Sequence, residues 1–167
     1  IDTKNASHMI ALLAHAAKKW IQEGLSAEEV VEKCEELKGR IRVFAGVDTL
    51  EYLQKGGRIG KATALVGTLA NIKPMITVSP EGTVDAVGKA LGFGRAVQTL
   101  AEKVKGCEID NQYPICSLYT YGKENCIKLE EKLKTAGIFV KSRLQIGSTI
   151  GTHVGPGVYG VFFVEKA

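Results

Sequence analysis

The four residues Ser79-Pro80-Glu81-Gly82 are the feature that most restricts how this 167-residue chain can fold. They separate two apolar segments, 72–78 and 83–88, and a turn of this composition between such segments predicts a β-hairpin. The two strands of a hairpin run antiparallel, so the sheet to which they belong cannot be wholly parallel.

Helix and strand patterns alternate along the rest of the chain. The predicted helices are 9–23, 27–38, 50–55, 60–70, 93–105 and 123–136, and the other predicted strands are 41–47, 114–121, 140–146 and 158–164. Ser26 with Glu29 three residues later forms a capping box for the second helix. A hairpin combined with helical crossovers predicts an α/β fold of the α+β kind, in which helices pack on a mixed, largely antiparallel sheet of about six strands. We expect a single domain over residues 1–167.

Composition excludes several classes of function. The chain is 45% hydrophobic and 24% charged, with a mild net charge of +4 and no basic stripe, which argues against nucleic-acid binding. No apolar run approaches the roughly 18 residues of a membrane span, so we expect no stable membrane insertion. The four cysteines form no CxxC pair, which is typical of buried thiols in the reducing cytoplasm. The three scattered histidines do not suggest a metal site, and we expect no cofactor.

The run Gly56-Gly57-Arg58-Ile59-Gly60 lies between two predicted helices. Its first two glycines allow a tight turn, and the second helix is expected to begin near Gly60, where free N–H groups favour an anion. Arg58 at this turn is able to present two donors to a carboxylate or a phosphate. A turn that carries a solvated arginine is the alternative, and the spacing leaves it open.

The run 147–157 contains four glycines and one proline, a composition that predicts a rigid loop bringing backbone donors close to a ligand. His153 lies in this loop and is able to donate a hydrogen bond to an anionic group. A structural role for this histidine is the alternative. The sequence has no defensible Ser/His/Asp or Cys/His set and no acidic pair suited to acid–base chemistry, so we predict no catalytic residue and favour binding over catalysis.

Two long motifs resemble the DegV family. The segment VDTLEYLQKGGRIGKATALVGTLANIKPMITVSPEGTV (47–84) is similar to the family's D-T-L-x-x-L-x-x-G-G-R-I stretch and the strand that follows it. The segment IGTHVGPGVYGVFF (150–163) is similar to the family's closing H-x-G-P-G loop and final strand. The opening IDTKNAS resembles the family's interdomain junction, which we place at 1–8, and LSAEEVVEKCEEL (25–37) resembles its second helix.

The resemblance implies that this chain is the C-terminal domain of a two-domain protein, and the chain's opening residues do not look like a natural start. Such proteins are non-catalytic carriers that hold one long-chain fatty acid, with the tail in this domain and the carboxylate at the domain interface. In bacteria with a fatty-acid kinase, the carrier presents that carboxylate for phosphorylation. The implied head-group residues are Arg58 and His153, together with Thr152 and Gly155 of the same loop. The apolar segments predict tail contacts from Leu65, Gly67, Leu69, Ile76 and Phe162.

Two other functions fit the same residues. Arg58 and His153 suit a phosphotransferase-like component that binds a phosphorylated intermediate, and an exposed former interface suits a regulatory domain that binds another protein. One departure from the family concerns the kinase: Leu91 stands where an arginine is common after Lys89, which thins a basic docking patch. The acyl chain length, the kinase and the oligomeric state stay open.

Overall fold

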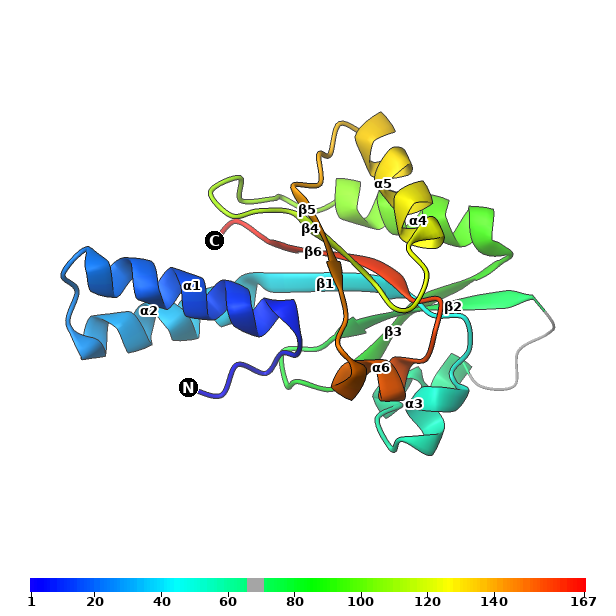
Figure 1. Cartoon of the computed structure of the whole chain (residues 1–167), viewed down its shortest axis with the longest axis horizontal. Helices are drawn as coiled ribbons and strands as arrows, with labels where there is room; N and C mark the ends of the chain where they lie inside the picture. Colours follow the sequence, from blue (N-terminus) through cyan, green and yellow to red (C-terminus); the bar gives the residue numbers. More distant parts are fainter. Residues whose placement is uncertain (66–70) are drawn as a thin grey trace.

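A computed structural model describes residues 1–65 and 71–167, and it contains a six-stranded sheet with the order β3-β2-β1-β6-β4-β5 (Figure 1). The strands are β1 (Ile41–Gly46), β2 (Ile72–Val78), β3 (Val84–Leu91), β4 (Cys116–Tyr119), β5 (Ser142–Gln145) and β6 (Tyr159–Val164). Neighbouring strands are antiparallel except β4 and β5, which confirms the predicted mixed, largely antiparallel sheet. The predicted hairpin is also confirmed: the Ser79 N–H donates to the Thr83 carbonyl at 2.8 Å.

The helices are α1 (His8–Gln22), α2 (Ala27–Arg40), α3 (Glu51–Lys55), α4 (Phe93–Lys105), α5 (Glu124–Thr135) and α6 (Ser148–Val154), and Gly60–Leu65 forms the 3₁₀ helix η1. The predicted capping box begins α2. The Ser26 hydroxyl accepts from the Glu29 N–H at 3.3 Å, and the Glu29 carboxylate accepts from the Ser26 N–H at 2.8 Å. Two donors of the first helical turn are thereby satisfied.

The sheet lies between two unequal layers of helices (Figure 1). Helices α4 and α5 cover one face, where Tyr159, Val161 and Phe163 of β6 join a large apolar core. On the other face, α1 and α2 enclose a second cluster that includes Phe162. A third, smaller cluster lies beneath α3, η1 and the end of α6. The side chains of β6 alternate between the two faces, as strand geometry requires.

Two sequence predictions differ from the structure. The predicted helix 60–70 is a 3₁₀ helix over Gly60–Leu65, and residues 66–70 lie outside the described part of the chain. The predicted loop 147–157 contains the helix α6. Glycine lowers helix propensity by about 1 kcal/mol, and the density of glycine in this segment therefore favoured a loop. Tertiary contacts override propensity here: Val154 packs against the core cluster that contains Leu53 and Val158, and the Gly155 carbonyl after the helix accepts from the Thr120 hydroxyl.

Candidate binding site

The face of the sheet opposite α4 and α5 does not form one continuous core. Between the cluster under α1 and α2 and the cluster under α3 and η1 lies a cavity of about 220 Å³. Its walls are almost wholly apolar and come from β1, β2, the N-terminal segment and α6. The apolar lining consists of Ala6, Met9, Val43, Ala45, Leu53, Ile76, Val78, Val84, Leu118, Ile146, Ile150, Val154 and Val158. Protein interiors rarely leave voids larger than a water molecule, so this cavity is a candidate site for an apolar group.

Arg58 and His153 both line this cavity, and Gly56 brings them together. The Arg58 guanidinium donates from Nη1 to the Gly56 carbonyl at 2.8 Å. The His153 ring packs on the α-carbon of the same glycine, where a β-carbon would overlap Nδ1 and lie 3.3 Å from Cε1. Nδ1 is buried and has no hydrogen-bond partner among the described residues.

The other predicted head-group residues do not line the cavity. Thr152 is exposed, and its hydroxyl donates to the Thr149 carbonyl of its own helix at 3.0 Å. Gly155 is buried with φ 79°, a conformation that favours glycine, and its α-carbon faces the ring of Tyr52. Both residues therefore lie near the site without facing its interior.

The predicted tail residues are divided among several locations. Ile76 lines the cavity, whereas Leu65 packs against the cluster beneath α3 and η1. Phe162 lines a different groove, of about 470 Å³, together with His8, His15 and Trp20 of α1. Gly67 and Leu69 lie outside the described residues. Of the tail predictions that the structure describes, only Ile76 faces the same cavity as Arg58 and His153.

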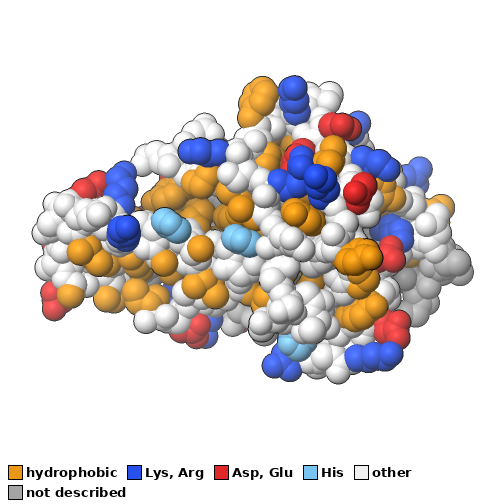
Figure 2. All heavy atoms as spheres, in the orientation of Figure 1, with side chains coloured by type: hydrophobic (Ala, Val, Ile, Leu, Met, Phe, Trp, Pro, Cys, Tyr) orange, Lys and Arg blue, Asp and Glu red, His pale blue; other side chains and the backbone are white. Residues whose placement is uncertain are grey.

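The larger groove adjoins an apolar surface. Figure 2 shows hydrophobic side chains gathered over α1 and α2, and Ile10, Ile21 and Val31 of these helices are exposed. The groove carries histidines along α1 but neither Arg58 nor His153. It is therefore a second apolar recess on the same face of the sheet, separate from the arginine.

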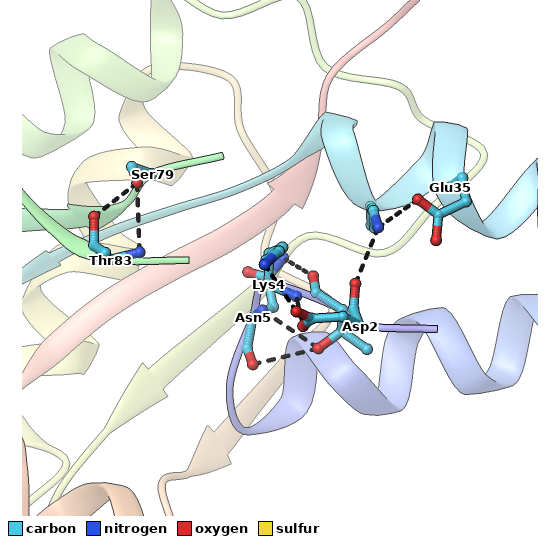
Figure 3. Close-up of polar contacts among 8 residues, drawn as sticks. Asp2, Lys4, Asn5, Glu35, Ser79 and Thr83 are labelled. Atoms are coloured by element: carbon cyan, nitrogen blue, oxygen red, sulfur yellow. Dashed lines mark hydrogen bonds and ion pairs between the residues drawn. The ribbon is translucent and has the colours of Figure 1, made fainter. Parts of the chain in front are cut away.

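The N-terminal segment before α1 is a part of the site that sequence reasoning missed. Residues Lys4, Asn5, Ala6 and Ser7 line the cavity, opposite the strands. The segment is fastened by local contacts: Lys4 forms an ion pair with Asp2 at 2.8 Å, and the Asn5 amide donates to the Thr3 carbonyl at 3.1 Å (Figure 3). Lys4 and Ser7 have positive φ angles, which a sequence pattern does not reveal.

The β2–β3 turn lies beside this segment. Ser79 and Thr83 share a hydroxyl–hydroxyl bond of 3.0 Å across the turn, as Figure 3 shows. Gly82 of the turn lines the cavity, and a β-carbon there would lie 3.3 Å from the Lys4 α-carbon. The turn and the N-terminal segment thus form one edge of the cavity.

Thr120, which follows β4, forms hydrogen bonds with the turn after α6. Its buried hydroxyl donates to the Gly155 carbonyl at 2.7 Å and accepts from the Val158 N–H at 3.0 Å. The Gly157 N–H in turn donates to the Thr120 carbonyl at 3.3 Å. These bonds fix to the sheet the segment that carries His153.

Several other features bear on function. Among the described residues, no helix is long and apolar enough to cross a membrane, and no cluster of three or more His, Cys, Asp or Glu is arranged to hold a metal ion. All four cysteines are free thiols. Burial raises the pKa of the Cys126 thiol to about 11, which disfavours the nucleophilic thiolate.

The six-stranded sheet, the helices packed on it and the apolar cavity bordered by Arg58 and His153 define an α/β domain with a candidate binding site. The chain belongs to the DegV family, because the family's sequence profile, described as "Uncharacterised protein, DegV family", matches residues 1–166. The DegV domain-containing protein YteA of Lactococcus lactis is 33% identical over 168 residues, which cover 99% of this chain and 58% of that protein.

Solved structures of the family share the fold. A DegV family protein of Thermus thermophilus, known for fatty-acid binding, is 32% identical with a TM-score of 0.84, and the match covers 99% of this chain and 60% of that one. The fatty-acid-binding DegV family protein SAG1342 of Streptococcus agalactiae is 28% identical with a TM-score of 0.89, covering 100% of this chain and 59% of that one. The chain therefore spans less than two thirds of the length of these relatives.

Proposed function

We propose that this chain binds a long-chain fatty acid without catalysing a reaction on it. The tail lies in the cavity between β1, β2 and α6, and the carboxylate lies beside Arg58 and His153. The observation that carries the proposal is that a guanidinium and an imidazole border one and the same apolar cavity. Fatty-acid binding by the Thermus and Streptococcus relatives supports it.

The acyl tail and the carboxylate contribute unequally to the free energy of binding. Burial contributes about 0.8 kcal/mol per methylene, so a chain of about 16 carbons gains roughly 12 kcal/mol before the costs of binding. A hydrogen bond to the charged carboxylate adds about 1.5–3 kcal/mol. The tail therefore supplies most of the affinity, and Arg58 and His153 orient the head group.

The cavity must widen to take a long tail. Its volume of about 220 Å³ is below the roughly 300–1,000 Å³ of typical small-molecule sites. The N-terminal segment is the wall that we expect to move, because its hydrogen bond to α2, from the Lys38 ammonium to the Asp2 carbonyl at 3.0 Å, is exposed to solvent. A hydrogen bond to a charged group contributes about 1.5–3 kcal/mol at most, less than the burial of several methylenes.

The proposal includes a partner and a compartment. A carboxylate held at the edge of the cavity is available to a fatty-acid kinase, the partner that the family resemblance implies. The compartment is the reducing cytoplasm, where free thiols such as Cys34 and Cys116 persist.

Native mass spectrometry with lipid extraction tests the proposal. The purified protein is expected to carry one fatty acid and to prefer oleate over methyl oleate in competition. Arg58→Ala is expected to retain lipid, but its preference for oleate over methyl oleate should be about tenfold lower than that of the wild type, because a charge-assisted hydrogen bond is removed. Lys55→Ala, on the same turn region but outside the cavity lining, is the control and keeps the preference. A protein that neither carries nor takes up fatty acid contradicts the proposal.

A further inference from the structure

Helices α3 and α6 contact each other through two ring–glycine pairs: His153 packs on Gly56, and Tyr52 packs on Gly155. Helix α3 ends at Gly56, whose α-carbon receives the His153 ring of α6. Helix α6 ends at Gly155, whose α-carbon receives the Tyr52 ring of α3, and a β-carbon there would lie 2.9 Å from Tyr52 Cγ. Each helix thus inserts one ring against the terminal glycine of the other.

Gly56 belongs both to this contact between α3 and α6 and to the proposed head-group site. Its carbonyl accepts the Arg58 guanidinium at 2.8 Å, while its α-carbon bears the His153 ring. One residue without a side chain therefore contacts both Arg58 and His153. Any substituent at position 56 must move the imidazole relative to the guanidinium.

Helix α6 depends on such contacts for its position. It has seven residues, none of them fully buried, and an isolated helix this short is not stable in water. Thr120 fixes its C-terminal turn to the sheet through Gly155. Tyr52 contacts the same glycine from the side of α3, and because the residue is 40% exposed it contributes little to the main core.

We propose that Tyr52 and Gly56 are positioning residues that set the separation of Arg58 and His153 and thereby the selectivity for a carboxylate head group. This inference rests on the proposed fatty-acid binding. A change at either residue disturbs recognition of the head more than retention of the tail, because β1 and β2 supply much of the apolar lining and are not held by these contacts.

The first test compares two alanine substitutions of glycine. Gly56 has φ −77°, so alanine fits its backbone, but the added methyl group overlaps the His153 ring. Gly56→Ala is expected to lower the preference for oleate over methyl oleate about tenfold, because the imidazole is displaced from the head group. Gly151→Ala is the matched control in α6, where an added β-carbon meets nothing within 4 Å. It is expected to leave the preference unchanged.

The second test uses rescue at position 52. Tyr52→Ala removes the ring from Gly155 and is expected to reduce the same preference and to shift the NMR signals of the His153 imidazole. Tyr52→Phe keeps the ring and is expected to restore both to wild-type values. A merely structural loss would weaken the acid and the ester alike.

These experiments distinguish the positioning role of Tyr52 and Gly56 from fatty-acid binding itself. If folded Gly56→Ala and Tyr52→Ala variants discriminate acid from ester as the wild type does, the positioning role is wrong while fatty-acid binding stands. If the wild type itself binds neither ligand, the proposed function is wrong.

Discussion

Thr120 and Val158 are joined by a buried hydrogen bond in which the Val158 N–H donates to the Thr120 hydroxyl at 3.0 Å. The same hydroxyl donates to the Gly155 carbonyl at 2.7 Å. Thr120→Val keeps the shape of the side chain but leaves a buried donor and a buried acceptor unpaired. We expect the free energy of unfolding to fall by about 1–3 kcal/mol, measured by urea denaturation. Thr120→Ser keeps the hydroxyl and serves as the control, and an unchanged stability in Thr120→Val would contradict this role.

The capping box of α2 gives a second prediction. Ser26→Ala removes the acceptor for the Glu29 N–H and is expected to lower the free energy of unfolding by about 1 kcal/mol. Glu29→Gln retains a side-chain acceptor for the Ser26 N–H and is expected to cost less. Thermal unfolding followed by circular dichroism measures both variants. An unchanged stability in Ser26→Ala would show that the Ser26 side chain does not stabilise the helix.

Glu130 on α5 links two strands and predicts a pH effect. Burial opposes its charged form, but hydrogen bonds from Arg143 and Ser117 outweigh this and lower the pKa of the carboxyl group below 4.5. A lowered native pKa stabilises the fold above the unfolded value, and this stabilisation is lost as the pH falls from about 4.5 through the native value. Glu130→Gln is expected to cost about 1.5 kcal/mol or more at pH 7 and to weaken the dependence of stability on acid pH.

The exposed neighbour Glu131 provides the control for this substitution. Glu131→Gln is expected to leave stability nearly unchanged at both pH values, as is usual for surface positions. Urea denaturation at pH 7 and at pH 3.5 distinguishes the two variants. If Glu130→Gln loses as much stability between these pH values as the wild type, the assignment of the acid transition to Glu130 is wrong.

The thiols predict slow alkylation of the folded protein. Burial and the nearby Glu165 raise the pKa of Cys107 to about 11, and burial raises that of Cys126 to about 11. At pH 8 the thiolate population of each is about 100-fold lower than for a thiol of pKa 9. Iodoacetamide labelling followed by peptide mass spectrometry should therefore be slow in buffer and fast in denaturant. Rapid labelling of native Cys126 would contradict its burial.

Local patterns predicted the parts of the fold that local chemistry controls. The hairpin turn at Ser79–Gly82 and the capping box at Ser26 are each complete within a few residues, and both are confirmed. The spacing of Ile150, His153 and Val154 is a helical signal for α6, but the glycines of that segment obscured it. The position of the N-terminal segment over the cavity depends on backbone angles that no pattern encodes.

The direction of Phe162 illustrates what a strand pattern leaves undetermined. Strand β6 is buried along its whole length, so its sequence is apolar on both faces of the sheet. Alternation then assigns Phe162 and Phe163 to opposite faces but does not say which face carries which residue. The pairing of Phe162 with Val43 on β1 and Cys116 on β4 settles this, and both pairings are remote in sequence.

A crystal structure with a bromine-labelled fatty acid would show directly where the tail binds. An acid that carries bromine near the end of its chain gives an anomalous signal at the position of the tail. We expect this signal between Val43, Ile76 and Val158, with the carboxylate at Arg58 and His153. A signal in the groove beside Trp20 and Phe162, with no ligand at Arg58, would contradict it.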